Sequence, residues 1–307
     1  MRGVLNAYKP KGPSSYDIIR DLKQLLSGAR GPGSESKVPG PESLPVLGHA
    51  GTLDPMATGV LVILVGEATR LSRFFLLSDK EYEAEVLFGK QTDTDDVTGR
   101  TVAEEPVPEL GAEELRATLG RFVGQIIQVP PKFSALKQDG VPQYRLARRG
   151  FEPEPRPRTV TVHSLALLDW SPPKARLHCV VSSGTYVRSL ARDIGKAAGS
   201  VACLSGLVRT RCGRFTLADS ISVEEASAEA IQQNLVQIDE ALPALPLVEV
   251  TDEIRTRLRH GQKATFELDE AVAGSEYLLA RTQDRRFLCL ARPVPGGLRS
   301  ERLIYAD

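Results

Sequence analysis

A glycine-rich segment that leads into an apolar run constrains the fold of this chain most strongly. Residues 48–59 read GHAGTLDPMATG and hold one carboxylate, Asp54, among three glycines, a proline and two threonines. Glycine permits backbone angles that other residues avoid, and Pro55 disfavours the helical conformation at Asp54. Because residues 60–65 follow as a short apolar run, the pattern predicts a stiff loop at the rim of a sheet. Asp54 is then either a turn residue that caps backbone amides or a reactive acid fixed by a rigid scaffold.

The composition is that of a globular chain with one or two domains. Of its 307 residues, 41% are hydrophobic and 25% are charged. The apolar run at residues 60–65 is too short to span a bilayer, and the first residues lack a signal-peptide pattern. Four cysteines form no Cys-x-x-Cys pair and lie at no zinc spacing with histidine, so we expect a reduced cytoplasmic protein without a metal site.

The net charge is zero, but the charges are segregated along the chain. Residues 132–159 carry seven Lys and Arg against three acids, and residues 185–214 carry six against one. Residues 81–114 show the reverse, with eleven acids against two bases. Clustered basic stretches are typical of nucleic-acid binding, although solvated faces produce them too.

Hydrophobic periodicity predicts both helices and strands along the chain. Residues 80–88 alternate so that Tyr82 lies on the inner side of a half-buried strand, and a serine at position 14 or 15 should cap a helix that ends near Leu26. The other predicted helices cover about 67–76, 112–122, 187–194, 222–236 and 252–260, and the other predicted strands cover 60–65, 124–128, 159–169, 174–182 and 204–215.

Several well-known motifs are incomplete or absent in this sequence. Residues 91–99 lack the ligand and the glycine that an EF-hand requires. Ser134 to Lys137 reads Ser-x-x-Lys, but the companion boxes of the penicillin-binding proteins are missing. The sequence holds no Gly-x-Ser-x-Gly, P-loop or Rossmann glycine pattern, and so no cofactor is expected.

The segment GHAGTLDPMATG resembles the catalytic loop of the TruB-type pseudouridine synthases. Lys9-Pro10, the segment 92–99, the stretch 132–148 and GTYVR at 184–188 match other motifs of that family in the same order. The resemblance implies an α+β pseudouridine-synthase fold with a central, mostly antiparallel mixed sheet flanked by helices. It also implies a catalytic domain at 1–245, with an RNA-binding thumb at 130–158, and a small β-rich PUA-like domain at 246–307.

The resemblance also implies the catalytic residues. Asp54 matches the essential aspartate, which acts as the nucleophile. Tyr82 matches the tyrosine that stacks on the flipped uracil and assists removal of its C5 proton. Arg188 matches an arginine that pairs with the aspartate and keeps it ionised. Lys9-Pro10 is expected to brace the loop of Asp54.

Further residues are expected to bind the substrate. His49 is expected either to fill the space left by displaced bases or to be a structural histidine. By resemblance, Tyr186 and Leu207 line the base pocket. Asp96 either lies near the bound nucleotide or caps its own turn. The residues expected to approach RNA are Lys137, Arg148 and Arg209. Residues 27–45, of which twelve of nineteen are Gly, Pro or Ser, depart from the family and are expected to be poorly ordered without RNA.

Such an enzyme isomerises a uridine in the T-loop of tRNA, at position 55, without a cofactor. The expected partner is the T-arm of tRNA. The protein is expected to be a monomer that needs no protein partner and binds no membrane. Two alternatives stay open: a guide-RNA-dependent synthase of the same fold, and a tRNA-folding chaperone without chemistry.

Overall fold

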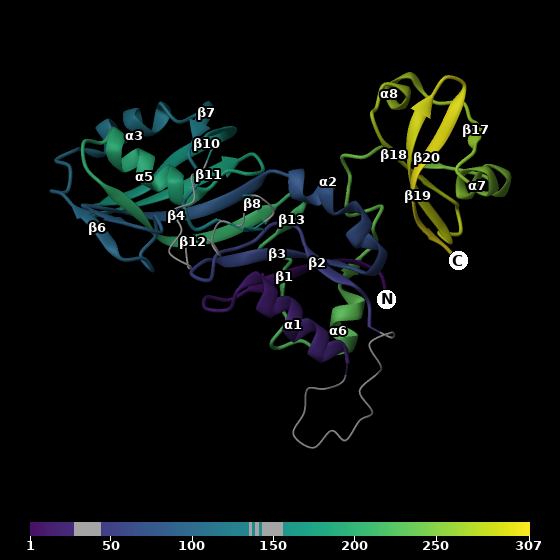
Figure 1. Ribbon diagram of the computed structural model, residues 1–307, viewed down its shortest axis with the longest axis horizontal. Coiled ribbons are helices and arrows are strands. Elements are labelled where there is room, and N and C mark those ends of the chain that lie inside the picture. The colour runs from purple at the N-terminus through teal and green to yellow at the C-terminus, as the bar shows by residue number, and fades with distance from the viewer. Residues whose placement is uncertain (28–43, 135–136, 139–140, 143–155) are drawn as a thin grey trace, which may run out of the picture.

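The computed structural model describes residues 1–27, 44–134, 137–138, 141–142 and 156–307 (Figure 1). The expectation of disorder in the 27–45 insertion falls almost entirely on residues outside these ranges, as does much of the expected thumb.

A mixed sheet of eleven strands forms the centre of the molecule. Its main path runs β14-β1-β3-β12-β4-β11-β10-β7, and two of its pairings, β1 with β14 and β12 with β3, are parallel. The other pairings are antiparallel, which confirms the predicted mostly antiparallel mixed sheet. The strands of this path are β1 (Gly3–Lys9), β3 (Thr58–Val65), β4 (Lys80–Phe88), β7 (Gly124–Gln128), β10 (Arg158–Ser171), β11 (Lys174–Val181), β12 (Ala202–Cys212) and β14 (Ile221–Ser222). Three short strands complete it: β2 (Leu47–His49) on β3, β13 (Phe215–Thr216) on β12 and β15 (Leu235–Val236) on β1.

Helices cover the sheet in two places (Figure 1). Helix α1 (Ser15–Leu26) has Ser14 as its N-cap, which is one of the two serines that the sequence predicts for this role, and Ser14 forms a capping box with Asp17. Its apolar side packs on β1 and β3 through Ile18, Ile19 and Leu22. Helices α3 (Ala112–Gly120) and α5 (Val187–Ala197) cover the part of the sheet built from β4, β10, β11 and β12. Strand β4 alternates between buried and half-buried residues along its whole length, so Tyr82 faces the core as predicted.

Two predicted helices differ from the structure, one in type and one in extent. Residues 66–77 are helical over almost the predicted range of 67–76, but they form a 3-10 helix, η1 (Gly66–Leu71), followed by α2 (Ser72–Leu77). The predicted helix at 222–236 shrinks to α6 (Ala228–Gln233), because the segments on both sides pair with β1 instead. Tertiary pairing outweighs the weak helical preference of these polar residues.

The last sixty residues form a separate five-stranded sheet of order β16-β18-β19-β20-β17. Its own core contains Phe287 and Leu298, while Leu288 and Ile304 join a cluster with the central sheet. Arg70 of η1 donates to the carbonyls of Leu303 and Ile304, so this sheet is bonded to the rest of the chain. Its elements are β16 (Leu247–Glu249), α7 (Asp252–Arg259), β17 (Lys263–Thr265), α8 (Glu270–Ala273), β18 (Leu278–Arg281), β19 (Phe287–Val294) and β20 (Gly297–Ala306).

Two further pairs of strands lie outside these sheets: β5 (Lys90–Thr92) with β6 (Thr101–Glu104), and β8 (Lys137–Gln138) with β9 (Val141–Pro142). Across the described residues, no helix has the length and apolar character needed to cross a membrane.

Candidate active site

The loop that carries Asp54 is non-helical and is braced by the N-terminal segment. Lys9, at the end of β1, donates from Nζ to the carbonyls of Ala57 at 2.7 Å and Pro10 at 3.0 Å. The Ser15 hydroxyl bonds to both the amide and the carbonyl of Leu53, at 2.8 and 3.0 Å. The amide of Gly12 donates to Pro55 at 2.8 Å. These bonds confirm that the Lys9-Pro10 segment braces the loop.

Lys9 is a buried cation beneath this loop. Its side chain is inaccessible to solvent, and burial lowers the pKa of Lys9 to about 8, while the charge of Asp54 acts in the opposite direction. A buried ammonium needs oxygen partners. Here the loop carbonyls supply them, so the charge and the loop conformation stabilise one another.

Asp54 forms an ion pair with Arg188, the second residue of α5. Nε of Arg188 lies 2.9 Å from Oδ2 of Asp54, and Nη2 donates to Oδ1 at 3.2 Å. The Asp54 side chain is 32% exposed, whereas that of Arg188 is 6% exposed. Burial raises the pKa of Asp54 above its usual value, and the Arg188 guanidinium opposes that rise. The acid therefore stands at the surface with a fixed cation behind it.

Arg188 is held by three further groups. It donates to the carbonyls of Thr94 and Phe133, both at 3.0 Å. Asp96 approaches it at 3.6 Å through Oδ2. Four residues of α5 that point away from this site, Val187, Leu190, Ala191 and Ile194, pack into the core as predicted. The buried face of the helix thus fixes the direction of the guanidinium.

Asp96 is buried in its own turn. Its Oδ1 accepts bonds from the Thr94 hydroxyl at 2.9 Å, from the Thr98 amide at 2.9 Å and from the Thr98 hydroxyl. Only 4% of the residue is exposed. Of the two roles expected from the sequence, these contacts match the turn cap, and they add an interaction with Arg188.

Tyr82 and Leu207 lie on the paired strands β4 and β12 and belong to one core cluster, which also contains Leu53. Each is 8% exposed. Burial raises the pKa of the Tyr82 hydroxyl, and a bond from the Arg209 guanidinium partly offsets this rise. An aromatic ring and an apolar side chain therefore belong to the same core cluster as Leu53, the residue that precedes Asp54.

Tyr186 caps the start of α5 next to Arg188. Its backbone exchanges two bonds with the side-chain amide of Gln128, at 2.8 and 3.2 Å, and Gln128 is fully buried. The sequence analysis missed Gln128, because a single polar residue at the end of a strand gives no signal before its partner is known.

Arg209 does not lie on the surface that the sequence suggested for it. It is 1% exposed, and it donates to the carbonyls of Val60 at 2.7 Å and Gly51 at 3.1 Å. Among the described residues, no carboxylate lies within ion-pair distance of it. A β-bulge explains the difference. Regular alternation would put residues 209 and 211 on the same face, but the register of β12 against β4 shifts between them, so that Arg209 points to the inner face and Arg211 pairs with Glu81 on the outer face. Arg209 is a brace for both ends of the loop.

Three other residues were expected to bind the substrate: His49, Lys137 and Arg148. His49 ends β2, and its Nδ1 is buried without a bond partner among the described residues. Burial and the charge of Arg209 lower the pKa of its ring. Lys137 is described only as part of strand β8, and Arg148 lies outside the described residues.

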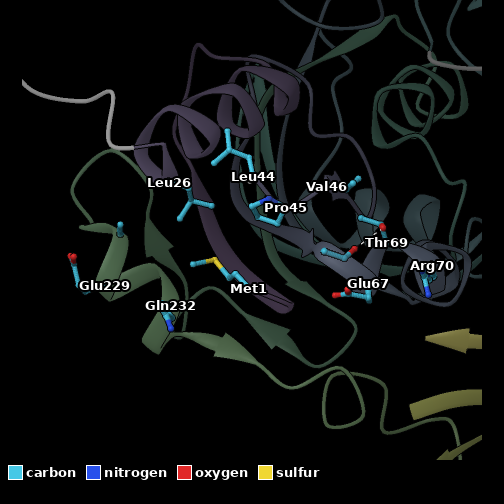
Figure 2. A pocket seen from close by; sticks show the side chains of 12 residues that line it. Met1, Leu26, Leu44, Pro45, Val46, Glu67, Thr69, Arg70, Glu229 and Gln232 are labelled. Carbon is cyan, nitrogen blue, oxygen red and sulfur yellow. Dashed lines mark hydrogen bonds between the residues drawn. The ribbon is translucent and has the colours of Figure 1, made fainter. Parts of the chain in front are cut away.

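A hollow of about 610 Å³ lies elsewhere, between α1, η1 and α6 (Figure 2). Its lining includes Met1, Leu26, Glu67 and Gln232, and none of the expected catalytic residues takes part in it. In the part of the chain that the structure describes, no group of three or more His, Cys, Asp and Glu side chains is placed to hold a metal ion.

Comparisons with known proteins identify the family of this chain. Residues 44–187 match the profile described as "TruB family pseudouridylate synthase (N terminal domain)". A protein of Cupriavidus pinatubonensis named tRNA pseudouridine synthase B is 39% identical, over 99% of this chain and 94% of its own. A protein of the same name from Clostridium tetani is 33% identical, over 99% of this chain and 100% of its own.

Solved structures share the fold. A Cbf5-Nop10-Gar1 complex contains a chain with a TM-score of 0.69 and 23% identity, over 99% of this chain and 85% of that one. A chain in an H/ACA RNP bound to a substrate RNA containing 2′-deoxyuridine has a TM-score of 0.68 and 22% identity. The match covers 98% of this chain and 84% of that one. The five-stranded C-terminal sheet is consistent with a PUA-like domain. With close relatives matching almost its whole length, the chain belongs to the TruB family of pseudouridine synthases.

Proposed function

We propose that this enzyme isomerises a uridine in the T-loop of tRNA, at position 55, to pseudouridine, with Asp54 as the nucleophile and without a cofactor. The observation that carries the proposal is the ion pair of Asp54 and Arg188 on a braced loop. It joins an accessible carboxylate to a buried guanidinium. The names of the relatives support tRNA as the substrate.

The reaction breaks the C1′–N1 bond and forms a C1′–C5 bond, and the proton leaves C5 while N1 gains one. The atoms of substrate and product are the same, so no oxidant or donor group is consumed. A carboxylate that forms a covalent intermediate can split such a difficult reaction into two easier steps. Asp54 attacks either C1′ of the ribose or C6 of the uracil. Burial raises the pKa of Asp54, and Arg188 opposes that rise, which favours the ionised form that attack requires.

The side chains next to Asp54 would hold the uracil. An aromatic ring is the usual platform for an RNA base turned out of its stack. We assign that role to Tyr82, which also assists removal of the C5 proton, with Leu207 and Tyr186 as further walls of the pocket. His49 would occupy the space that the flipped base leaves. Asp96 orients Arg188 and lies close enough to the site to adjoin the nucleotide.

RNA binding would involve two further parts of the chain. The thumb at 130–158 carries Lys137 and Arg148, and phosphate contacts there make affinity fall steeply with salt. The segments 1–245 and 246–307 would act as catalytic and PUA-like domains. We propose that the enzyme works as a cytoplasmic monomer without a protein partner.

The test is Asp54→Asn, assayed on a tRNA transcript and on an isolated T-arm. We expect loss of pseudouridine formation with tRNA binding retained, because the amide keeps the shape of the side chain but cannot act as the nucleophile. Asp169→Asn, at an exposed position on β10, is the matched control and should keep full activity. A rate near that of the unaltered enzyme in Asp54→Asn would overturn the assignment. Activity that appears only with an added guide RNA, or tRNA refolding without pseudouridine, would favour the alternatives.

A further inference from the structure

Helix α5 presents a second arginine one turn after Arg188. Arg192 lies four residues on, so both side chains leave the same face of the helix. The side chain of Arg192 is 13% exposed. Its Nη1 lies 2.8 Å from Oδ2 of Asp95, Nη2 donates to the carbonyl of Val129 at 3.0 Å, and Nε donates to Asp193 at 2.9 Å. The five donors of this guanidinium are thus largely used within the protein.

Asp95, the main partner of Arg192, directly precedes Asp96. It has a φ of +60°, a conformation that non-glycine residues adopt only when the surroundings hold them in it. The amide of Leu204 in β12 donates to its carbonyl at 3.0 Å, and its side chain is 8% exposed. Burial raises the pKa of Asp95, and Arg192 opposes that rise. The pair therefore fixes the turn from which Asp96 and the Thr94 carbonyl reach Arg188.

The same helix also holds the segment that leads to the thumb. Val129 accepts from Arg192 and from the Ser189 hydroxyl, at 3.0 and 2.9 Å. Four residues later, the carbonyl of Phe133 accepts from Arg188. Arg192 thus binds the two segments, 92–98 and 129–133, that also provide the carbonyl anchors of Arg188.

We propose that Arg192 and Asp95 form a clamp that positions Arg188 against Asp54. The clamp residues themselves do not touch the substrate. This inference rests on the proposed function, because it assumes that the Asp54–Arg188 pair performs the chemistry. Small displacements of such a pair are costly, since a misplacement of about 1 Å can slow a reaction by about a hundredfold.

The experiment uses the full chain with Arg192→Met and Asp95→Asn. Asn tolerates a positive φ, so Asp95→Asn keeps the backbone and removes only the charge. We expect single-turnover pseudouridine formation to slow by about ten- to a hundredfold, with the Kd for tRNA unchanged. Lys196→Met removes an equal charge from an exposed position one turn further along α5 and should leave the rate unchanged. Arg192→Lys should recover part of the rate, because an ammonium can still pair with Asp95.

A second set of variants distinguishes a positioning role of Arg192 from a general loss of stability. In an Arg188→Lys background, Arg192→Met should slow the reaction no further, because the guanidinium that it positions is already missing. In a Tyr82→Phe background it should have its full effect. Equal slowing in both backgrounds, or no slowing of the parent enzyme, would overturn the clamp. Activity retained in Asp54→Asn would instead refute the proposed function, so the two failures are distinguishable.

Discussion

Arg188 and Asp54, 134 residues apart in the chain, form an ion pair whose two members differ in their access to solvent. The guanidinium is almost fully buried and bonded to two carbonyls, while a third of the carboxylate side chain is exposed. The cation is therefore fixed by the protein, and the anion is the member that a substrate can approach.

The first prediction concerns the pH dependence of the rate. Burial raises the pKa of Asp54 and Arg188 lowers it, so Arg188→Met should raise that pKa further. The ionised acid then forms only at higher pH, and the acid limb of the single-turnover rate profile should move upward in pH. Arg188→Lys keeps a positive charge and should leave the limb close to its original position while lowering the plateau. A limb that stays in place in Arg188→Met would contradict this account.

The second prediction separates the two roles proposed for Tyr82. Tyr82→Phe keeps the ring, and base stacking is worth about 1–3 kcal/mol, so the Kd for tRNA should change little. The hydroxyl is lost, so the single-turnover rate should fall. Tyr82→Leu, as the contrast, should weaken binding as well. If Tyr82→Phe turns over at the parent rate, the hydroxyl takes no part in proton transfer.

The third prediction concerns stability. Arg209→Met leaves the buried carbonyls of Gly51 and Val60 without their donors, which should lower the free energy of unfolding by roughly 2–4 kcal/mol. Arg211→Met, two residues along the same strand, removes a partly exposed ion pair with Glu81 and should cost about 0–1 kcal/mol. Urea denaturation of both variants measures the difference. Equal losses of unfolding free energy in the two variants would contradict the role of Arg209 as a brace of the loop.

The fourth prediction compares two glycines with similar backbone angles. Gly59 and Gly12 have φ of +107° and +115°, but a Cβ on Gly59 would lie 2.3 Å from the carbonyl oxygen of Arg209, whereas one on Gly12 would meet nothing within 4 Å. Gly12→Ala should therefore cost only backbone strain, about 1–3 kcal/mol. Gly59→Ala should cost a further amount of roughly 1–3 kcal/mol for the overlap, and more if the strands cannot separate. Thermal melts of the two variants, run at one pH, make the comparison.

The sequence by itself determined the local elements and the loop. Alternation places Tyr82 on the inner face of β4, Ser14 caps α1, and the glycines and Pro55 exclude helix around Asp54, because each of these effects depends on neighbouring residues only. Where a weak local preference competed with pairing to a distant strand, as at residues 222–236, the local prediction was too long.

Only the tertiary structure decided which side chains meet beneath the loop. Arg209 is a buried brace, and Arg192 holds the turn of Asp96 from the helix of Arg188. Both roles depend on strand register and on contacts between residues that lie 149 and 97 positions apart in the chain. A guanidinium looks the same in the sequence whether it faces RNA or a backbone carbonyl. Its role follows from which face of the sheet or helix is buried, and that is fixed when the distant strands pair.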